Sequence, residues 1–227
     1  MIVTAHRLRI DRDDNVWVTD IGCHRVFKFD PRGKLLLVLG SGTAGPGIEQ
    51  FNKPTDVAFV PLAEVYVSNG YGNSRVVKFS PSGAPITSWG KAGKKPGEFR
   101  LPHSIVVDRR GRILVGDREN DRVQIFNDEG ALLDIWTGIA PFGLAFDKVG
   151  DLYVADGRAN TVSRLDASGT IRRSWGRKGK APGEFEMPHM LAFDLAGNLL
   201  VAEINGMRLQ KLVREPTSTP PARDSAR

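Results

Sequence analysis

Three of the four histidines in this 227-residue chain stand at the start of an alternating apolar stretch. They are His6, His103 and His189, and the separations between them are 97 and 86 residues. Imidazole nitrogens are common zinc ligands, and three of them with an open fourth position are typical of a catalytic zinc site. We therefore interpret the three histidines as candidate ligands of one Zn²⁺ ion. The alternative is that each histidine only makes a local hydrogen bond where its strand begins.

Two further polar segments could act beside a metal ion. Gly70–Arg75 contains Tyr71 between two glycines, and Asp117–Asn120 contains Arg118 at the equivalent place one repeat later. A tyrosine next to a metal ion could accept a proton, and a guanidinium group could hold a carboxylate through two parallel hydrogen bonds. We expect both segments to lie on one rim of the molecule. The alternative is a packing tyrosine and an ordinary ion pair on that rim.

The elements that must position these side chains are five repeats of about 45 residues each. Every repeat begins with an alternating strand, turns at Gly or Asp into a second apolar strand, and adds a third strand. Four of the repeats continue into a fourth strand, whereas the fifth stops after its third. The expected first strands are residues 6–11, 56–60, 103–108, 143–147 and 189–194. In this phase, Asp56 and Gly143 occupy the histidine position in the second and fourth repeats.

Four-stranded units repeated in this way predict an all-β propeller of antiparallel blades, in which each blade buries its faces against its neighbours. The predicted domain is 1–215, and the Pro- and Ser-rich segment 216–227 is expected to be a disordered tail. In a ring of six blades, alternate blades lie about 120° apart, so the three histidines would converge on the axis. A ring of five would break that symmetry. The placement of the three histidines in alternate repeats therefore favours a ring of six blades.

Composition limits the classes of partner. The formal charge is +6, but basic residues are spread over all repeats, so nucleic acid is not an expected partner, even with basic loops at 91–95 and 177–180. No apolar run is long enough to span a membrane, and we expect a monomer that takes a small-molecule or peptide substrate. Cys23 is the single cysteine and leaves the compartment open. No signal peptide is recognisable, which indicates a cytoplasmic protein if the chain is complete and a secreted one if an N-terminal segment is missing.

The repeat spacing, the strand-Asp links and the Trp-Gly endings such as Trp89-Gly90 resemble the NHL repeat family. The resemblance implies a propeller with six blades. Because five repeats are detectable, one blade is expected to be missing, most simply ahead of Met1.

The chain also resembles the peptidyl-α-hydroxyglycine α-amidating lyases over roughly residues 5 to 213. The matching motifs are 17–20 with 24–28, 53–58, 70–75, 102–104, 117–120 and 187–189. The resemblance implies zinc ligands at His6, His103 and His189, a base at Tyr71, an active-site arginine at Arg118 and a methionine beside the last ligand at Met187.

The reaction implied by the resemblance is zinc-dependent cleavage of a carbinolamide C–N bond, which gives a peptide amide and glyoxylate. The family's second active-site arginine belongs to the missing blade. Its calcium site uses the carbonyl matching Leu8 and an Asp after the third histidine, where this chain has Met190, so calcium is not expected. The alternative function is a non-catalytic NHL-repeat propeller that binds a protein, a small ligand or, less readily, RNA.

Overall fold

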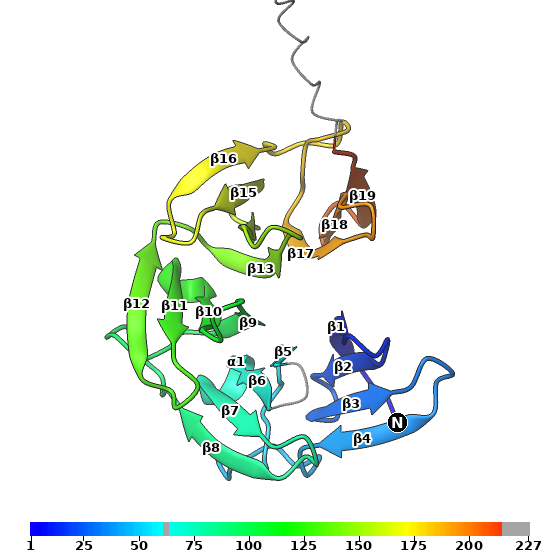
Figure 1. The fold of residues 1–227 in the computed structure, drawn as a ribbon, viewed down its shortest axis with the longest axis vertical. Coiled ribbons are helices and arrows are strands. Elements are labelled where there is room, and N and C mark those ends of the chain that lie inside the picture. The colour runs from blue at the N-terminus through cyan, green and yellow to red at the C-terminus, as the bar shows by residue number, and fades with distance from the viewer. Residues whose placement is uncertain (61–63, 215–227) are drawn as a thin grey trace, which may run out of the picture.

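The computed structural model of the protein describes residues 1–60 and 64–214. These residues form five antiparallel sheets arranged as the blades of a propeller (Figure 1). The structure confirms the all-β propeller fold. The predicted tail at 216–227 lies outside the described residues.

The first two blades each have four strands. Blade 1 contains β1 (Ala5–Ile10), β2 (Val16–Asp20), β3 (Arg25–Phe29) and β4 (Leu35–Leu39). Blade 2 contains β5 (Asp56–Phe59), β6 (Val65–Asn69), β7 (Arg75–Phe79) and β8 (Pro85–Trp89). In both blades the strands pair in chain order, with the first strand innermost.

The other three blades repeat this pattern. Blade 3 contains β9 (Pro102–Val107), β10 (Ile113–Asp117), β11 (Arg122–Phe126) and β12 (Leu132–Thr137). Blade 4 contains β13 (Pro141–Phe146), β14 (Leu152–Asp156), β15 (Thr161–Leu165) and β16 (Ile171–Trp175). Blade 5 contains β17 (Pro188–Phe193), β18 (Leu199–Glu203) and β19 (Arg208–Leu212). Blade 5 therefore has three strands in the described part of the chain, as its sequence predicted.

Apolar side chains from adjacent blades form four separate cores, one at each contact from blade 1 through blade 5. The loop phenylalanines Phe51, Phe99 and Phe185 are fully buried where one blade leads into the next. Residues 96–99 and 182–185 both read Pro-Gly-Glu-Phe, and this burial explains the two loops as structural links between blades. Glu98 Oε2 accepts the Lys95 N–H at 3.0 Å, which gives that carboxylate a role in shaping the loop.

The ring is open between blade 5 and blade 1 (Figure 1). Each inner strand from β1 to β13 contacts the next one, but β17 and β1 make no comparable contact among the described residues. Leu8 in β1 is 54% exposed, whereas the equivalent Ile105 and Leu144 are fully buried. The face of blade 1 that carries Leu8 thus lacks the neighbour that covers this face in the other blades.

The strand register corrects the predicted phase of the second and fourth repeats. The middle valine of each second strand pairs with a residue of the inner strand, in the order Leu8, Val57, Ile105, Leu144 and Leu191. Two residues before each of these lie His6, Thr55, His103, Phe142 and His189. Thr55 and Phe142 therefore occupy the histidine position, and the assignment of Asp56 and Gly143 to it was wrong by one residue.

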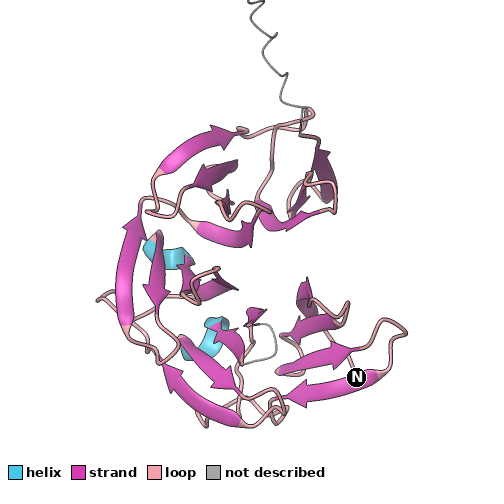
Figure 2. Ribbon diagram, in the orientation of Figure 1, coloured by secondary structure: helices cyan, strands magenta, loops and turns pink. Residues whose placement is uncertain are grey.

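Short helical segments follow two of the second strands (Figure 2). They are α1 (Gly70–Asn73) after β6 and the 3₁₀ turn η1 (Arg118–Asn120) after β10. The two segments hold the predicted Tyr71 and Arg118.

No helix in the described ranges is long and apolar enough to cross a membrane.

Candidate metal centre

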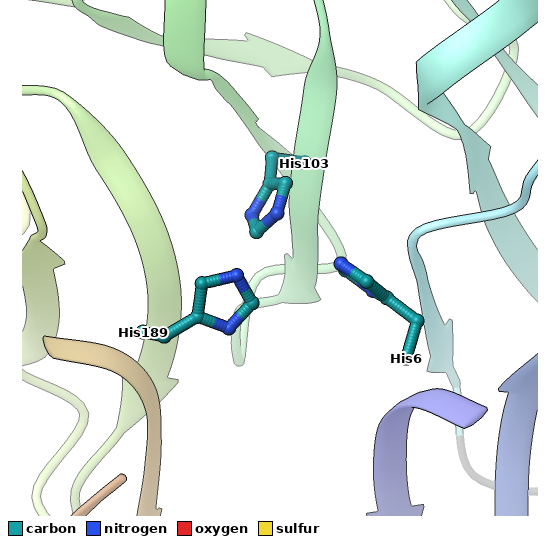
Figure 3. A group of neighbouring side chains, drawn as sticks. All are labelled: His6, His103 and His189. Atoms are coloured by element: carbon teal, nitrogen blue, oxygen red, sulfur yellow. The ribbon is translucent and has the colours of Figure 1, made fainter. Parts of the chain in front are cut away.

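The three histidines point toward one another at the axis of the propeller (Figure 3). The imidazole centroids of His103 and His189 are 4.7 Å apart, and that of His6 lies 5.0 and 5.5 Å from them. One nitrogen of each ring lies within 4.8 Å of the other two. The structure therefore brings together the three histidines that the repeat phase singled out.

A β-bulge aims each of these rings inward. The pairing of the inner strand with the second strand skips the histidine, for example between Ala5 and Arg7 in blade 1. The same irregularity occurs at His103 and His189, where the preceding residue is proline. Proline has no N–H for the ladder, so it tolerates such a break, and a bulge redirects the side chain that it carries.

Main-chain carbonyls of the next blade orient two of the rings. His6 Nδ1 lies 2.7 Å from the Thr55 carbonyl oxygen, and His103 Nδ1 lies 2.7 Å from that of Phe142. Because a carbonyl only accepts, each Nδ1 carries the proton and each Nε2 presents its lone pair. His189 belongs to the last described blade, and within the described residues neither of its nitrogens has a hydrogen-bond partner.

The donor set fits a zinc ion. Three nitrogens at about 2.0–2.1 Å from a tetrahedral ion lie about 3.4 Å from one another. Small rotations of the imidazole rings would bring the three nitrogens from their observed separations to this distance. The carbonyl contacts of His6 and His103 are of the kind that metal-bound histidines usually make through their other nitrogen. The missing contact at His189 leaves the third ligand less firmly oriented than the first two.

Tyr71 lies directly beside the triad. Its hydroxyl is 3.2 Å from His6 Nε2 and 3.4 Å from His103 Nε2, and its side chain is partly exposed. Gly70 makes this approach possible, because a Cβ there would lie 2.2 Å from the Pro102 carbonyl oxygen. The hydroxyl therefore reaches the same two lone pairs that a metal ion would use.

Arg118 lies on the same side as Tyr71. Its guanidinium carbon is 4.6 Å from the ring centroid of Phe142, whose own ring lies 5.7 Å from that of His103. Arg118 Nε donates to Glu119 Oε1 at 2.8 Å, and within residues 1–60 and 64–214 the terminal nitrogens have no partner. The ion-pair alternative thus holds for one edge of the guanidinium group, while its other edge is available to a ligand.

Two other residues singled out from the sequence are Met187 and His24. Met187 has a left-handed backbone, with a φ of 58°, and its N–H donates to Asn160 Oδ1 at 2.9 Å. A role for Met187 beside the last ligand stays a prediction. His24 lies in a turn away from the triad, where its Nδ1 accepts the Lys53 N–H at 3.1 Å.

Sequence reasoning missed a charged network behind the triad. Arg7, Asp56 and Ser104 occupy the same inner-strand position in three successive blades, and all three are buried. Ser104 Oγ donates to Asp56 Oδ2 at 2.8 Å and accepts from Arg7 Nη2 at 2.7 Å. The detectable signal was the alignment itself, since three polar residues share one position of an otherwise apolar strand.

Burial keeps the histidines neutral. It lowers the pKa of His189 to about 3, with the cation of Arg7 adding to the effect, and it holds the pKa of His103 well below the ordinary value. Desolvation also lowers the pKa of His6. Neutral imidazoles are the form that binds metal ions.

The same pKa shifts predict acid sensitivity of the metal-free protein. Unfolding returns each histidine to a pKa near 6.5, so below that pH the unfolded chain binds more protons than the folded one. The stability is thus complete above pH 6.5 and decreases as the pH falls, by about 1.4 kcal/mol per pH unit for each neutral buried histidine. Urea unfolding at pH 7 and pH 5 measures this loss. A His189→Gln variant should show a shallower pH dependence, and identical slopes would contradict the assignment.

Comparison with known proteins agrees with the fold. Residues 99–126 match the NHL repeat. The chain is an NHL-repeat β-propeller. The matched residues cover the end of a loop, β9, β10, η1 and β11, so they include His103 and Arg118.

Curated relatives include amidating enzymes and NHL repeat-containing proteins. The chain is 49% identical over 134 residues to mouse peptidyl-glycine α-amidating monooxygenase, covering 55% of this chain and 14% of that protein. It is 31% identical over 245 residues to peptidyl-α-hydroxyglycine α-amidating lyase 1 of Drosophila melanogaster, covering 95% of this chain and 45% of the fly protein. It is also 33% identical over 226 residues to mouse NHL repeat-containing protein 3, covering 92% and 65%. The chain spans less than two thirds of each of these relatives.

Among solved structures, a streptogramin B lyase superposes with a TM-score of 0.67 at 14% identity, covering 93% of this chain and 69% of that one. At this level of identity the likeness shows the propeller fold alone.

Proposed function

We propose that this NHL-repeat propeller is a lyase of the amidating type, which cleaves a peptidyl-α-hydroxyglycine into an amide and glyoxylate at a zinc ion held by His6, His103 and His189. The observation that carries the proposal is the convergence of three histidine nitrogens within 4.8 Å, with the Tyr71 hydroxyl beside two of them. Similarity to the fly lyase over most of the chain supports the reaction class.

The residues around the triad fit the demands of this reaction. A bound zinc ion supplies a Lewis acid for the substrate hydroxyl oxygen. Tyr71 is placed to accept the proton of that hydroxyl, and Arg118 presents a guanidinium edge for the carboxylate. The C–N bond breaks as the C–O bond becomes a carbonyl, and one proton leaves the hydroxyl while one is delivered to the nitrogen. The reaction therefore needs no outside oxidant or reductant.

The direct test is product formation from N-benzoyl-α-hydroxyglycine by zinc-loaded protein. We expect benzamide and glyoxylate in equal amounts, measured by chromatography and by a coupled glyoxylate assay. Protein that carries one zinc ion but forms neither product above the rate in buffer would contradict the proposal for this chain.

Arg118→Met is expected to raise KM for this substrate about 10- to 100-fold, because a charge-assisted hydrogen bond to the carboxylate is lost. Steady-state kinetics checks the change. Arg112→Met is the matched control, since Arg112 pairs with Asp108 in the turn after β9. An unchanged KM in Arg118→Met would remove Arg118 from the substrate site.

The second candidate function is a non-catalytic binding platform. It is compatible with the similarity to mouse NHL repeat-containing protein 3, whose name states no reaction. It is favoured by His189, whose ring nitrogens have no hydrogen-bond partner within the described residues. The two candidates differ in one measurable property, because a binding platform needs neither zinc nor turnover. Salt-dependent retention of RNA would favour an RNA-binding version. Two basic residues of the loops that could contact RNA, Lys91 and Arg177, already form ion pairs with Glu98 and Glu184. These pairs weaken the case for RNA as the ligand.

A further inference from the structure

The channel behind the triad does not fit the calcium ion that the amidating-lyase resemblance implies. Met190 stands where the resemblance places an aspartate, and its side chain offers no oxygen ligand. The resemblance also uses the main-chain carbonyl at Leu8. The carbonyls at the equivalent position in blades 3 and 4, those of Ile105 and Leu144, both accept hydrogen bonds from Arg9 Nη2, at 3.3 and 3.2 Å. A guanidinium group thus binds the carbonyls that face the channel.

We propose that Arg9, supported by Arg7, takes the place of a structural cation in the channel, so that the propeller is held together without calcium. Both arginines extend from the inner strand of blade 1 toward blades 2, 3 and 4. Arg9 binds Asp56 through Nε at 3.0 Å and Nη2 at 2.7 Å, in addition to its two carbonyls. Arg7 Nη2 reaches Ser104 at 2.7 Å and the Phe142 carbonyl at 3.4 Å. Two side chains therefore connect four of the five blades across the axis.

The charge balance of the channel also disfavours an added calcium ion. Asp56 is fully buried and is shared by both arginines, with Arg7 Nε 3.2 Å and Arg9 Nη2 2.7 Å from its Oδ2. Although burial on its own raises the pKa of Asp56, the two guanidinium groups lower it to about 2, so the carboxylate stays ionised. Two cations and one anion leave a net charge of +1 on this network. A divalent ion would have to enter a channel that is already positive.

Solvent can reach this position, which makes a calcium titration informative. The Arg9 side chain is 18% exposed and lines a hollow of about 430 Å³ together with Leu8, Phe59, Val107 and Phe193. The hollow opens at the end of the channel away from the triad, because its residues come from the C-terminal halves of the inner strands. An absence of calcium binding would therefore not reflect a lack of access for the ion.

The first test adds calcium to calcium-depleted protein at fixed zinc content. We expect a change in Tm below about 1 °C and no saturable heat in titration calorimetry, whereas a structural calcium site at saturation would raise Tm by about 5 °C or more. A saturable rise of that size would overturn the proposal. The readout is stability, so the result does not depend on whether the protein has lyase activity.

The second test removes the cation. Arg9→Met should lower Tm by about 6–12 °C, because it breaks a buried charged network in a protein of this size. Arg172→Met is the matched control, since Arg172 forms an exposed pair with Asp166, and it should change Tm by less than about 2 °C. Arg9→Lys keeps the charge and should recover part of the loss. Equal Tm values for the Arg9→Met and Arg172→Met variants would overturn the proposal.

Discussion

Replacing His103 with alanine is expected to reduce bound zinc from about one equivalent per chain to below about 0.1, because two imidazoles do not complete a zinc site. The lyase activity should fall to the background rate with it. His103 is the most buried of the three ligands, and the Phe142 carbonyl fixes its orientation. Elemental analysis after equilibration with zinc and gel filtration gives the metal content, and glyoxylate release gives the activity.

The control for this substitution is His24→Ala. His24 is the one histidine outside the triad, and its Nδ1 accepts a main-chain N–H in a turn. This variant should keep its full zinc content and activity. Equal zinc content in the His103→Ala and His24→Ala proteins would show that the triad does not bind the metal.

Replacing Tyr71 with phenylalanine is expected to lower kcat by about 10²- to 10⁴-fold, the usual contribution of a positioned acid or base. Zinc content should not change, since Tyr71 lies beside the ligand nitrogens and is not one of the three imidazoles. The combination of unchanged zinc and lost turnover separates this residue from the ligands. Steady-state kinetics together with elemental analysis checks both quantities.

Tyr153→Phe provides the comparison for Tyr71→Phe. The Tyr153 ring stacks on Trp175 in blade 4 and meets Phe193 of blade 5 edge-on, away from the triad. This variant should retain kcat within about twofold, as expected for a surface change away from the chemistry. If Tyr71→Phe and Tyr153→Phe turned over equally fast, Tyr71 would not be the base.

The alternating strands and their turn residues were sufficient to predict the blades, because each strand signal is local. The convergence of the histidines followed from their spacing, since residues at one phase of a propeller repeat share one height along the axis. The one-residue error at Gly143 has a specific cause. The histidine and Phe142 positions are bulges, and a bulged residue has no place in a strict two-residue alternation.

The charged network behind the triad could not be predicted in the same way. Arg7, Asp56 and Ser104 are about one repeat apart along the chain, and their contact depends on how the blades pack around the axis. The reach of Arg9 to the carbonyls of Ile105 and Leu144 is set by the backbone geometry of two other blades. The open side of the ring likewise became visible through the exposure of Leu8.

X-ray absorption at the zinc edge tests the central claim most directly, because it reports the ligands of the metal in the folded protein. We predict a zinc ion with three imidazole nitrogens at about 2.0–2.1 Å and one further oxygen or nitrogen ligand. The His103→Ala protein should show no such spectrum. A wild-type spectrum with oxygen ligands alone, or one that includes the sulfur of Cys23, would contradict a zinc site at His6, His103 and His189.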